Sequence, residues 1–183
     1  LRIAAYRFEN RGYVDMVSDS DPSKVVIAND FGGVLNNRTE VGGNEFAGVR
    51  ASLLWQPADN LSVTLMHARQ DLDQNGMSYI DPDIGGYKST ALDFNGEFDG
   101  QEGRSDEGSF TNLVINYDLS WGNLISSTTI SDSTQIRDIA GSRFIPLPLP
   151  IRNENSRDNF TQELRVSSQL SGPVQFLGGI YYE

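Results

Sequence analysis

Apolar and polar residues alternate along much of this chain, and only a β-strand places such an alternation on two separate faces. The segments that show it are 46–56, 61–69, 110–121, 159–170 and 174–182. The segments 1–17 and 124–136 also have the composition of strands, without an assignable face. Helical periodicity does not extend over three turns in any segment. The sequence therefore predicts an all-β chain of about seven strands.

The alternation assigns charged and apolar residues to opposite faces of the predicted strands. Leu53, Leu113 and Leu164 belong to the apolar faces, whereas the charged residues Arg50, Glu163 and Arg165 fall on the other side. Charges without partners are costly in a dry protein core, but they cost little beside water. We therefore expect one face of the sheet to meet an apolar medium and the other to line a water-filled or plugged lumen.

The connections between the predicted strands alternate in length. Short polar turns occupy 57–60, 122–123 and 171–173, and long polar stretches occupy 18–45, 71–107 and 137–158. Outer-membrane barrels have strands of about 9–11 residues, short turns on one side and long loops on the other. Trp55, Trp121 and Phe176 lie near the short turns, as expected of rings at a lipid–water boundary. The pattern predicts an antiparallel up-and-down meander that forms part of a transmembrane β-barrel.

Composition excludes several classes of function. The 14 Lys and Arg residues face 25 Asp and Glu residues, a net charge of −11 that disfavours nucleic acid as a partner. There is no cysteine and one histidine, His67, so thiolate and most zinc sites are ruled out. No run of about 18 apolar residues could form a transmembrane helix. No constellation of residues supports catalysis, and we expect neither an enzyme nor a cofactor nor a metal.

Several stretches of strand sequence carry a family resemblance. The run 160–168 (FTQELRVSS), followed by 178–182 (GGIYY), resembles a strand pair of TonB-dependent outer-membrane receptors. The run 49–57 (VRASLLWQP), continuing into 60–63 (NLSV), looks like an earlier hairpin of the same barrel. The resemblance is strongest to the receptors that aquatic and soil α-proteobacteria carry in large sets.

The resemblance implies a large, plugged, 22-stranded barrel in the bacterial outer membrane. Such receptors take up scarce nutrients, most often ferric siderophores, with energy relayed by TonB. The TonB-contacting segment and the plug are absent from residues 1–183, and seven strands do not close a barrel. The resemblance therefore implies an internal barrel fragment that contacts lipid, shares a small-molecule nutrient site, and meets the TonB complex only through parts outside this sequence.

Ligand-binding residues are expected in the long loops and the lumen, and the candidates are Tyr79, Tyr87, Arg143 and Arg152. The arginines around 143–157 could attract an anionic ligand or could pair with the acidic stretch 71–107. The run 71–76 (DLDQNG) resembles the start of a calcium loop, but Pro82 occupies the position that needs a bidentate acid. A solvated acidic turn is the preferred interpretation there.

A second class of protein also fits the alternation. A secreted or surface β-sandwich could bind carbohydrate through exposed aromatic residues. The two hypotheses differ in what covers the faces that carry Leu53, Leu113 and Leu164. In a barrel these faces form a lipid-facing band about 25 Å tall, whereas in a sandwich they meet a second sheet about 10 Å away.

Overall fold

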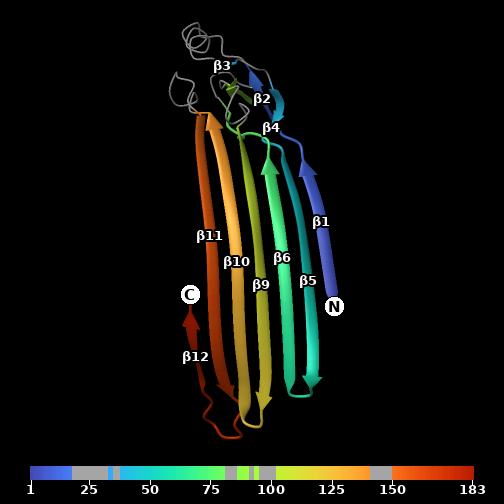
Figure 1. Ribbon diagram of the computed structural model, residues 1–183, viewed down its shortest axis with the longest axis vertical. Helices are drawn as coiled ribbons and strands as arrows, with labels where there is room; N and C mark the ends of the chain where they lie inside the picture. Colours follow the sequence, from blue (N-terminus) through green and yellow to red (C-terminus); the bar gives the residue numbers. More distant parts are fainter. Residues whose placement is uncertain (18–32, 35–37, 81–85, 91–92, 95–101, 141–149) are drawn as a thin grey trace.

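The computed structural model describes residues 1–17, 33–34, 38–80, 86–90, 93–94, 102–140 and 150–183. Its main feature is one seven-stranded antiparallel sheet in which strands adjacent in the sheet also follow one another along the chain (Figure 1). In order across the sheet they are β1 (Arg2–Asn10), β5 (Asn44–Ala58), β6 (Leu61–Gln74), β9 (Gly103–Leu119), β10 (Gly122–Ala140), β11 (Pro150–Ser168) and β12 (Leu177–Tyr182). The predicted all-β antiparallel meander is confirmed.

Five short strands lie beyond the end of the sheet that is opposite the short turns, the upper end in Figure 1. β2 (Val14–Val17) pairs with β4 (Arg38–Val41) and β7 (Lys88–Thr90), and β3 (Gly33–Val34) pairs with β8 (Asp93–Phe94). The predictions of one strand over 1–17 and of a loop throughout 18–45 are therefore wrong. The break falls at Gly12, where a Cβ atom would lie 2.0 Å from the carbonyl oxygen of Glu40, so only glycine allows the two backbones to approach this closely.

Four strands extend into stretches that the sequence predicts as loops. Residues 71–74, 103–107, 137–140 and 150–158 belong to β6, β9, β10 and β11. Both faces of these extensions are largely polar, so no alternation marks them. Cross-strand hydrogen bonds hold them instead: Ser105 Oγ donates to Asp73 Oδ1 at 2.9 Å, and Arg152 Nε donates to Asp138 Oδ1 at 2.7 Å.

The strand register aligns the apolar residues on one face of the sheet. Leu53 pairs with Leu65, which pairs in turn with Leu113. One step toward the short turns on the same face, Leu164 pairs with Ile180. We call this side the apolar face. Because side chains alternate along a strand, Arg50 and Arg165 lie on the other side, the polar face, as the sequence predicts.

The seven-stranded sheet is a single layer. Within the described residues, the elements that contact one another extensively are neighbours in the same sheet, and no second sheet packs on either face of the large one. The fully buried hydrophobic side chains among them are Val14 and Val41, both in the small upper sheet. The large sheet is also open, since β1 and β12 each have one neighbouring strand. It thus shows a meander with two uncovered faces, but not a closed barrel.

Candidate functional site

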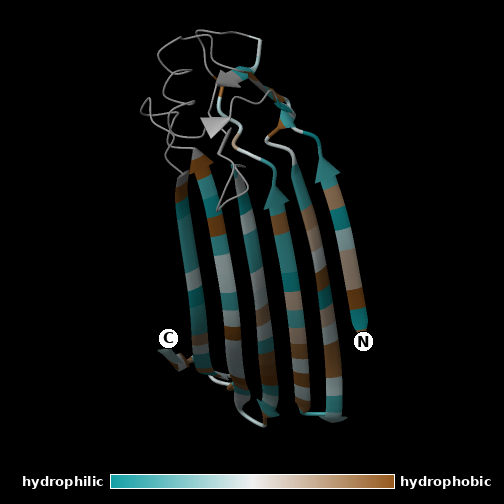
Figure 2. Cartoon of the chain, turned by 45° about the horizontal axis from the view of Figure 1, so that its top comes forward, coloured by the Kyte–Doolittle hydropathy of each residue, from teal (hydrophilic) through white to brown (hydrophobic). Residues whose placement is uncertain are grey.

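Charge separates between the two faces in the upper half of the sheet. The polar face carries cationic side chains, namely those of Arg2, Arg50, Arg104, Arg137 and Arg157, together with the carboxylate of Asp106. The apolar face becomes acidic above its leucine rows, with Glu9, Glu45, Asp71, Asp73, Glu107, Asp132, Asp138, Glu154 and Asp158. On β5, β6 and β9, Figure 2 shows the related change from brown toward the short-turn end to teal at the upper end.

The arginines of the acidic side are paired. Arg7 Nε lies 2.7 Å from Glu45 Oε1. Arg69 Nη2 lies 3.0 Å from both Asp71 Oδ1 and Glu107 Oε2. These exposed pairs contribute little to stability, but they leave no spare cation at these positions.

Most arginines of the polar face are not paired. Arg104 forms an ion pair with Asp106, and this hydrogen bond raises the pKa of the Arg104 guanidinium at the upper end of β9. Arg137 lies directly opposite Arg104 on β10, and its Nε atom is buried without a hydrogen-bond partner. Within the described residues, Arg50 and Arg157 also form no ion pair. This face therefore presents positive charge, although the whole chain is acidic.

Small residues hollow out the polar face near mid-height. Gly48, Ala68, Gly108, Ser131 and Ser133 occupy neighbouring positions on four strands. Two depressions of about 460 and 350 Å³ lie there, and both are lined by Gln70 and Gly108. Since they share these residues, they are adjacent, and together they make up a hollowed area whose lining extends from β1 to β11. We call it the polar-face groove.

The two parts of the groove differ in chemistry. On the β1 side it is lined by Tyr6, Phe110 and Arg50. The Tyr6 ring lies on Gly48, where a Cβ atom would be 2.6 Å from it, and its hydroxyl donates to Gln70 Oε1 at 2.7 Å. On the β11 side the lining is polar and includes Asp106, Ser133, Gln135, Asn155 and Arg157.

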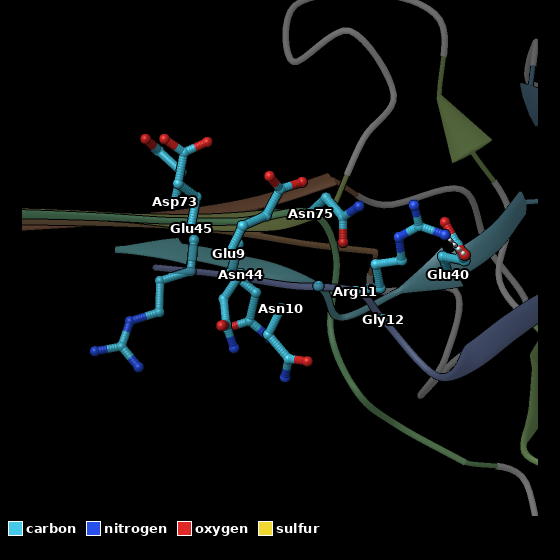
Figure 3. A pocket seen from close by; sticks show the side chains of 12 residues that line it. Glu9, Asn10, Arg11, Gly12, Glu40, Asn44, Glu45, Asp73 and Asn75 are labelled. Carbon is cyan, nitrogen blue, oxygen red and sulfur yellow. Dashed lines mark ion pairs between the residues drawn. The ribbon is translucent and has the colours of Figure 1, made fainter. Parts of the chain in front are cut away.

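A third depression, of about 570 Å³, lies at the upper rim (Figure 3). The carboxylates of Glu9, Glu45 and Asp73 point to one side of the strands there, and Asn10 and Asn44 point to the other. Hydrogen bonds between Gly42 N and Asn75 O (3.0 Å) and between Asn75 N and Gly43 O (2.9 Å) tie β5 to β6 beside it. In the part of the chain that the structure describes, no group of three His, Asp or Glu side chains is placed to hold a metal.

The sequence-predicted ligand residues do not gather in one place. Tyr79 and Tyr87 lie in the connection between β6 and β9, where the Tyr87 ring packs edge-on against Tyr13 at 6.1 Å. Arg152 lies on β11, three strands away from β6 in the sheet, and its Nε donates to Asp138 Oδ1 at 2.7 Å on the apolar face. Arg143 is outside the described residues.

The residues proposed as a calcium loop belong mainly to a strand. Asp71 and Asp73 lie on β6 and bond to Arg69 and to Ser105. A strand cannot bring oxygens one, three and five of a calcium loop around one ion, so the predicted turn is wrong and the calcium resemblance has no structural basis here. His67 Nδ1 lies 2.9 Å from Thr111 Oγ1, a cross-strand hydrogen bond rather than a catalytic arrangement.

The groove residues Tyr6, Gln70 and Phe110 are not identifiable as a site from the sequence. They are spread over 105 positions of the chain and meet only because of the register of β1, β5, β6 and β9. The available signal is two glycines inside strands, Gly48 and Gly108, since glycine in a strand often marks a close approach or an open space.

No helix in the described residues is long and apolar enough to cross a membrane. Comparisons with protein-family models, with curated proteins and with solved structures found no match for this chain.

Proposed function

We propose that this chain forms part of the wall of an outer-membrane receptor of the TonB-dependent type, which takes up a scarce small-molecule nutrient. The observation that carries the proposal is the exposed apolar face. Leu53, Leu65 and Ile115 are exposed although they sit at the centre of a well-formed sheet. Monomers in water rarely expose contiguous apolar patches of this kind, whereas lipid covers them in a membrane barrel.

The height of the apolar face supports a membrane role. Its rows run from the pair Leu61–Tyr117 to the pair Ile130–Phe160. These rows are six residues apart along a strand, which corresponds to roughly 20 Å at about 3.4 Å per residue. The apolar band of outer-membrane barrels is about 25 Å tall, so the two heights agree within about one further row.

Aromatic residues gather at both ends of this band. At the short-turn end, the rings of Trp121 and Phe176 lie 6.0 Å apart. At the other end, the rings of Phe160 and Tyr182 lie 6.2 Å apart. Outer-membrane barrels carry such aromatic girdles at both interfaces.

The polar residues that interrupt the band bond to one another. Thr128 Oγ1 donates to Gln162 Oε1 at 2.6 Å, and Gln162 Nε2 donates to Ser126 Oγ at 3.0 Å. A polar group without a partner would cost several kcal/mol in lipid. This bonded cluster is therefore compatible with a membrane-facing position.

In this proposal the polar face lines the barrel interior, the short turns face the periplasm and the upper segments face the medium. The chain acts as a receptor and transport wall in the outer membrane, not as an enzyme. Its partners are lipid, a nutrient such as a ferric siderophore and, through parts beyond residues 1–183, the TonB complex. The unpaired arginines of the polar face support an anionic nutrient.

Spin labels test the proposal. Single cysteine variants at Leu53, Leu65, Leu113 and Leu164 are labelled in phospholipid nanodiscs, together with matched sites on the polar face at Ser52, Met66, Val114 and Glu163. Labels on the apolar face should collide with dissolved oxygen more than with a water-soluble nickel complex, and the matched labels should show the reverse. Equal water accessibility on both faces would refute the membrane assignment.

A further inference from the structure

Two arginines that form no ion pair within the described residues line the polar-face groove, one in each of its two depressions. Arg50 on β5 lines the depression beside Tyr6, and Arg157 on β11 lines the depression beyond Gly108. The two strands are four spacings apart in the sheet. At about 4.8 Å per spacing, and with Arg157 two residues (about 7 Å) along β11 from the position in register with Arg50, their backbones are roughly 20 Å apart along the sheet. A ligand that pairs with both arginines must bridge the part of this distance that the two side chains do not span.

The floor between the arginines offers groups that both donate and accept hydrogen bonds. Gln70, Ser133, Gln135 and Asn155 line it. Amide and hydroxyl side chains of this kind match the adjacent hydroxyl groups of a sugar, each of which also donates and accepts. Gly108 and Ser133 keep the floor low, so a chain of sugar rings could lie across the strands.

The aromatic end adds an apolar surface. The Tyr6 ring is held by Gly48 on one side and by its hydroxyl bond to Gln70, and both Tyr6 and Phe110 are exposed on the groove side of the sheet. The C–H face of a pyranose ring packs on such rings through ordinary apolar contact. Amides, hydroxyls, exposed rings and arginines are thus found in one elongated groove.

We propose that the polar-face groove binds a linear acidic oligosaccharide, a short uronate chain whose carboxylates pair with Arg50 and Arg157. The inference rests on the proposed function, because it names the class of nutrient that the receptor wall contacts. It also departs from the expected ferric siderophore, since the amides and hydroxyl of the groove floor and its exposed rings match a chain of sugar rings.

Calorimetric titration of the chain in phospholipid nanodiscs tests this inference. The probes are tetragalacturonate, its neutral counterpart maltotetraose, and ferric enterobactin, a compact ferric complex that is also anionic. We expect tetragalacturonate to bind at least tenfold more tightly than either of the others. Arg50→Gln and Arg157→Gln should each weaken its binding at least tenfold, because each removes one charge-assisted hydrogen bond.

Two further variants sharpen the test. Arg7→Gln is the matched control, since Arg7 lies on the opposite face and pairs with Glu45; its affinity should equal that of the unmodified chain. Gly108→Phe fills the groove without straining the backbone, because a Cβ atom there meets its nearest neighbour, Asp132 O, at an ordinary 3.7 Å. It should abolish binding while the β-sheet circular dichroism is retained.

Absent binding, equal affinity for tetragalacturonate and maltotetraose, or unchanged affinity in Arg50→Gln and Arg157→Gln would overturn the inference. The spin labels at Leu53 and Leu113 report on the proposed function separately. If the labels are exposed to lipid but tetragalacturonate does not bind, the oligosaccharide site is refuted and the membrane role is retained. If the labels are exposed to water and binding depends on the arginines, the membrane role is refuted and the groove assignment is retained.

Discussion

At the residue scale, a glycine allows the close packing between segments at the upper rim of the sheet. Gly76 has a φ of +96°, and a Cβ atom there would lie 2.5 Å from Val41 Cγ1. Val41 is one of the buried hydrophobic side chains of the described residues. Any side chain at Gly76 therefore strains the backbone and pushes on the small buried cluster.

We predict that Gly76→Ala opens the rim locally. The strain should cost about 1–3 kcal/mol, so the amide protons of Gly42 and Asn75, which hold β5 to β6, should exchange about tenfold faster or more. Gly172→Ala is the control, because nothing lies within 4 Å of a Cβ atom at Gly172. Unchanged exchange in Gly76→Ala would show that the rim absorbs the methyl group.

At the element scale, alternation predicts faces well and strand ends poorly. Leu53, Leu113 and Leu164 fall on one face as the pattern indicates, because successive side chains of a strand point to opposite faces through its whole length. Strand ends such as Asp71–Gln74 and Gly103–Glu107 are missed, since both of their faces are polar and the backbone pairing alone sustains them.

The candidate site was less predictable than the fold. Arg152 was expected in a loop, but it lies on β11 and faces Asp138. Tyr6 and Phe110 come together through strand register, which depends on pairings between distant segments. The alternation in a single sequence predicts the face on which each residue lies, but it does not predict which residues lie beside it on the neighbouring strands.

Adjacent positions on one strand give a matched test of the two faces. Leu113→Lys places a charge on the apolar face of β9. We expect it to lower the free energy of unfolding of the chain, measured in lipid vesicles, by about 2–4 kcal/mol. Val114→Lys places the same charge one residue along, on the polar face, and should cost less than about 1 kcal/mol. Urea unfolding followed by tryptophan fluorescence measures both; equal costs would contradict the assigned faces.

At the scale of the whole molecule, neither face of the large sheet is covered by another layer of the described residues. Its described residues bury almost no apolar side chain within the protein, so internal packing alone cannot offset the conformational entropy lost on folding. Hydrogen bonds between strands define the shape, and the surroundings must supply the apolar contact. This arrangement supports the proposed role of the sheet as part of a membrane barrel wall.

The separation of charge between the two faces has an electrical consequence. A water path along the polar face would run beside Arg50, Arg137 and Arg157, while most carboxylates of the upper half lie behind the sheet and the polar-face acids Asp106 and Glu163 are paired with arginines. Such a path should conduct chloride in preference to potassium. In planar bilayers under a salt gradient, the reversal potential should have the sign of anion selectivity. The selectivity should fade toward about 1 M salt, where the screening length shrinks to about 3 Å; a cation-selective current would place the carboxylates, not the arginines, along the conducting path.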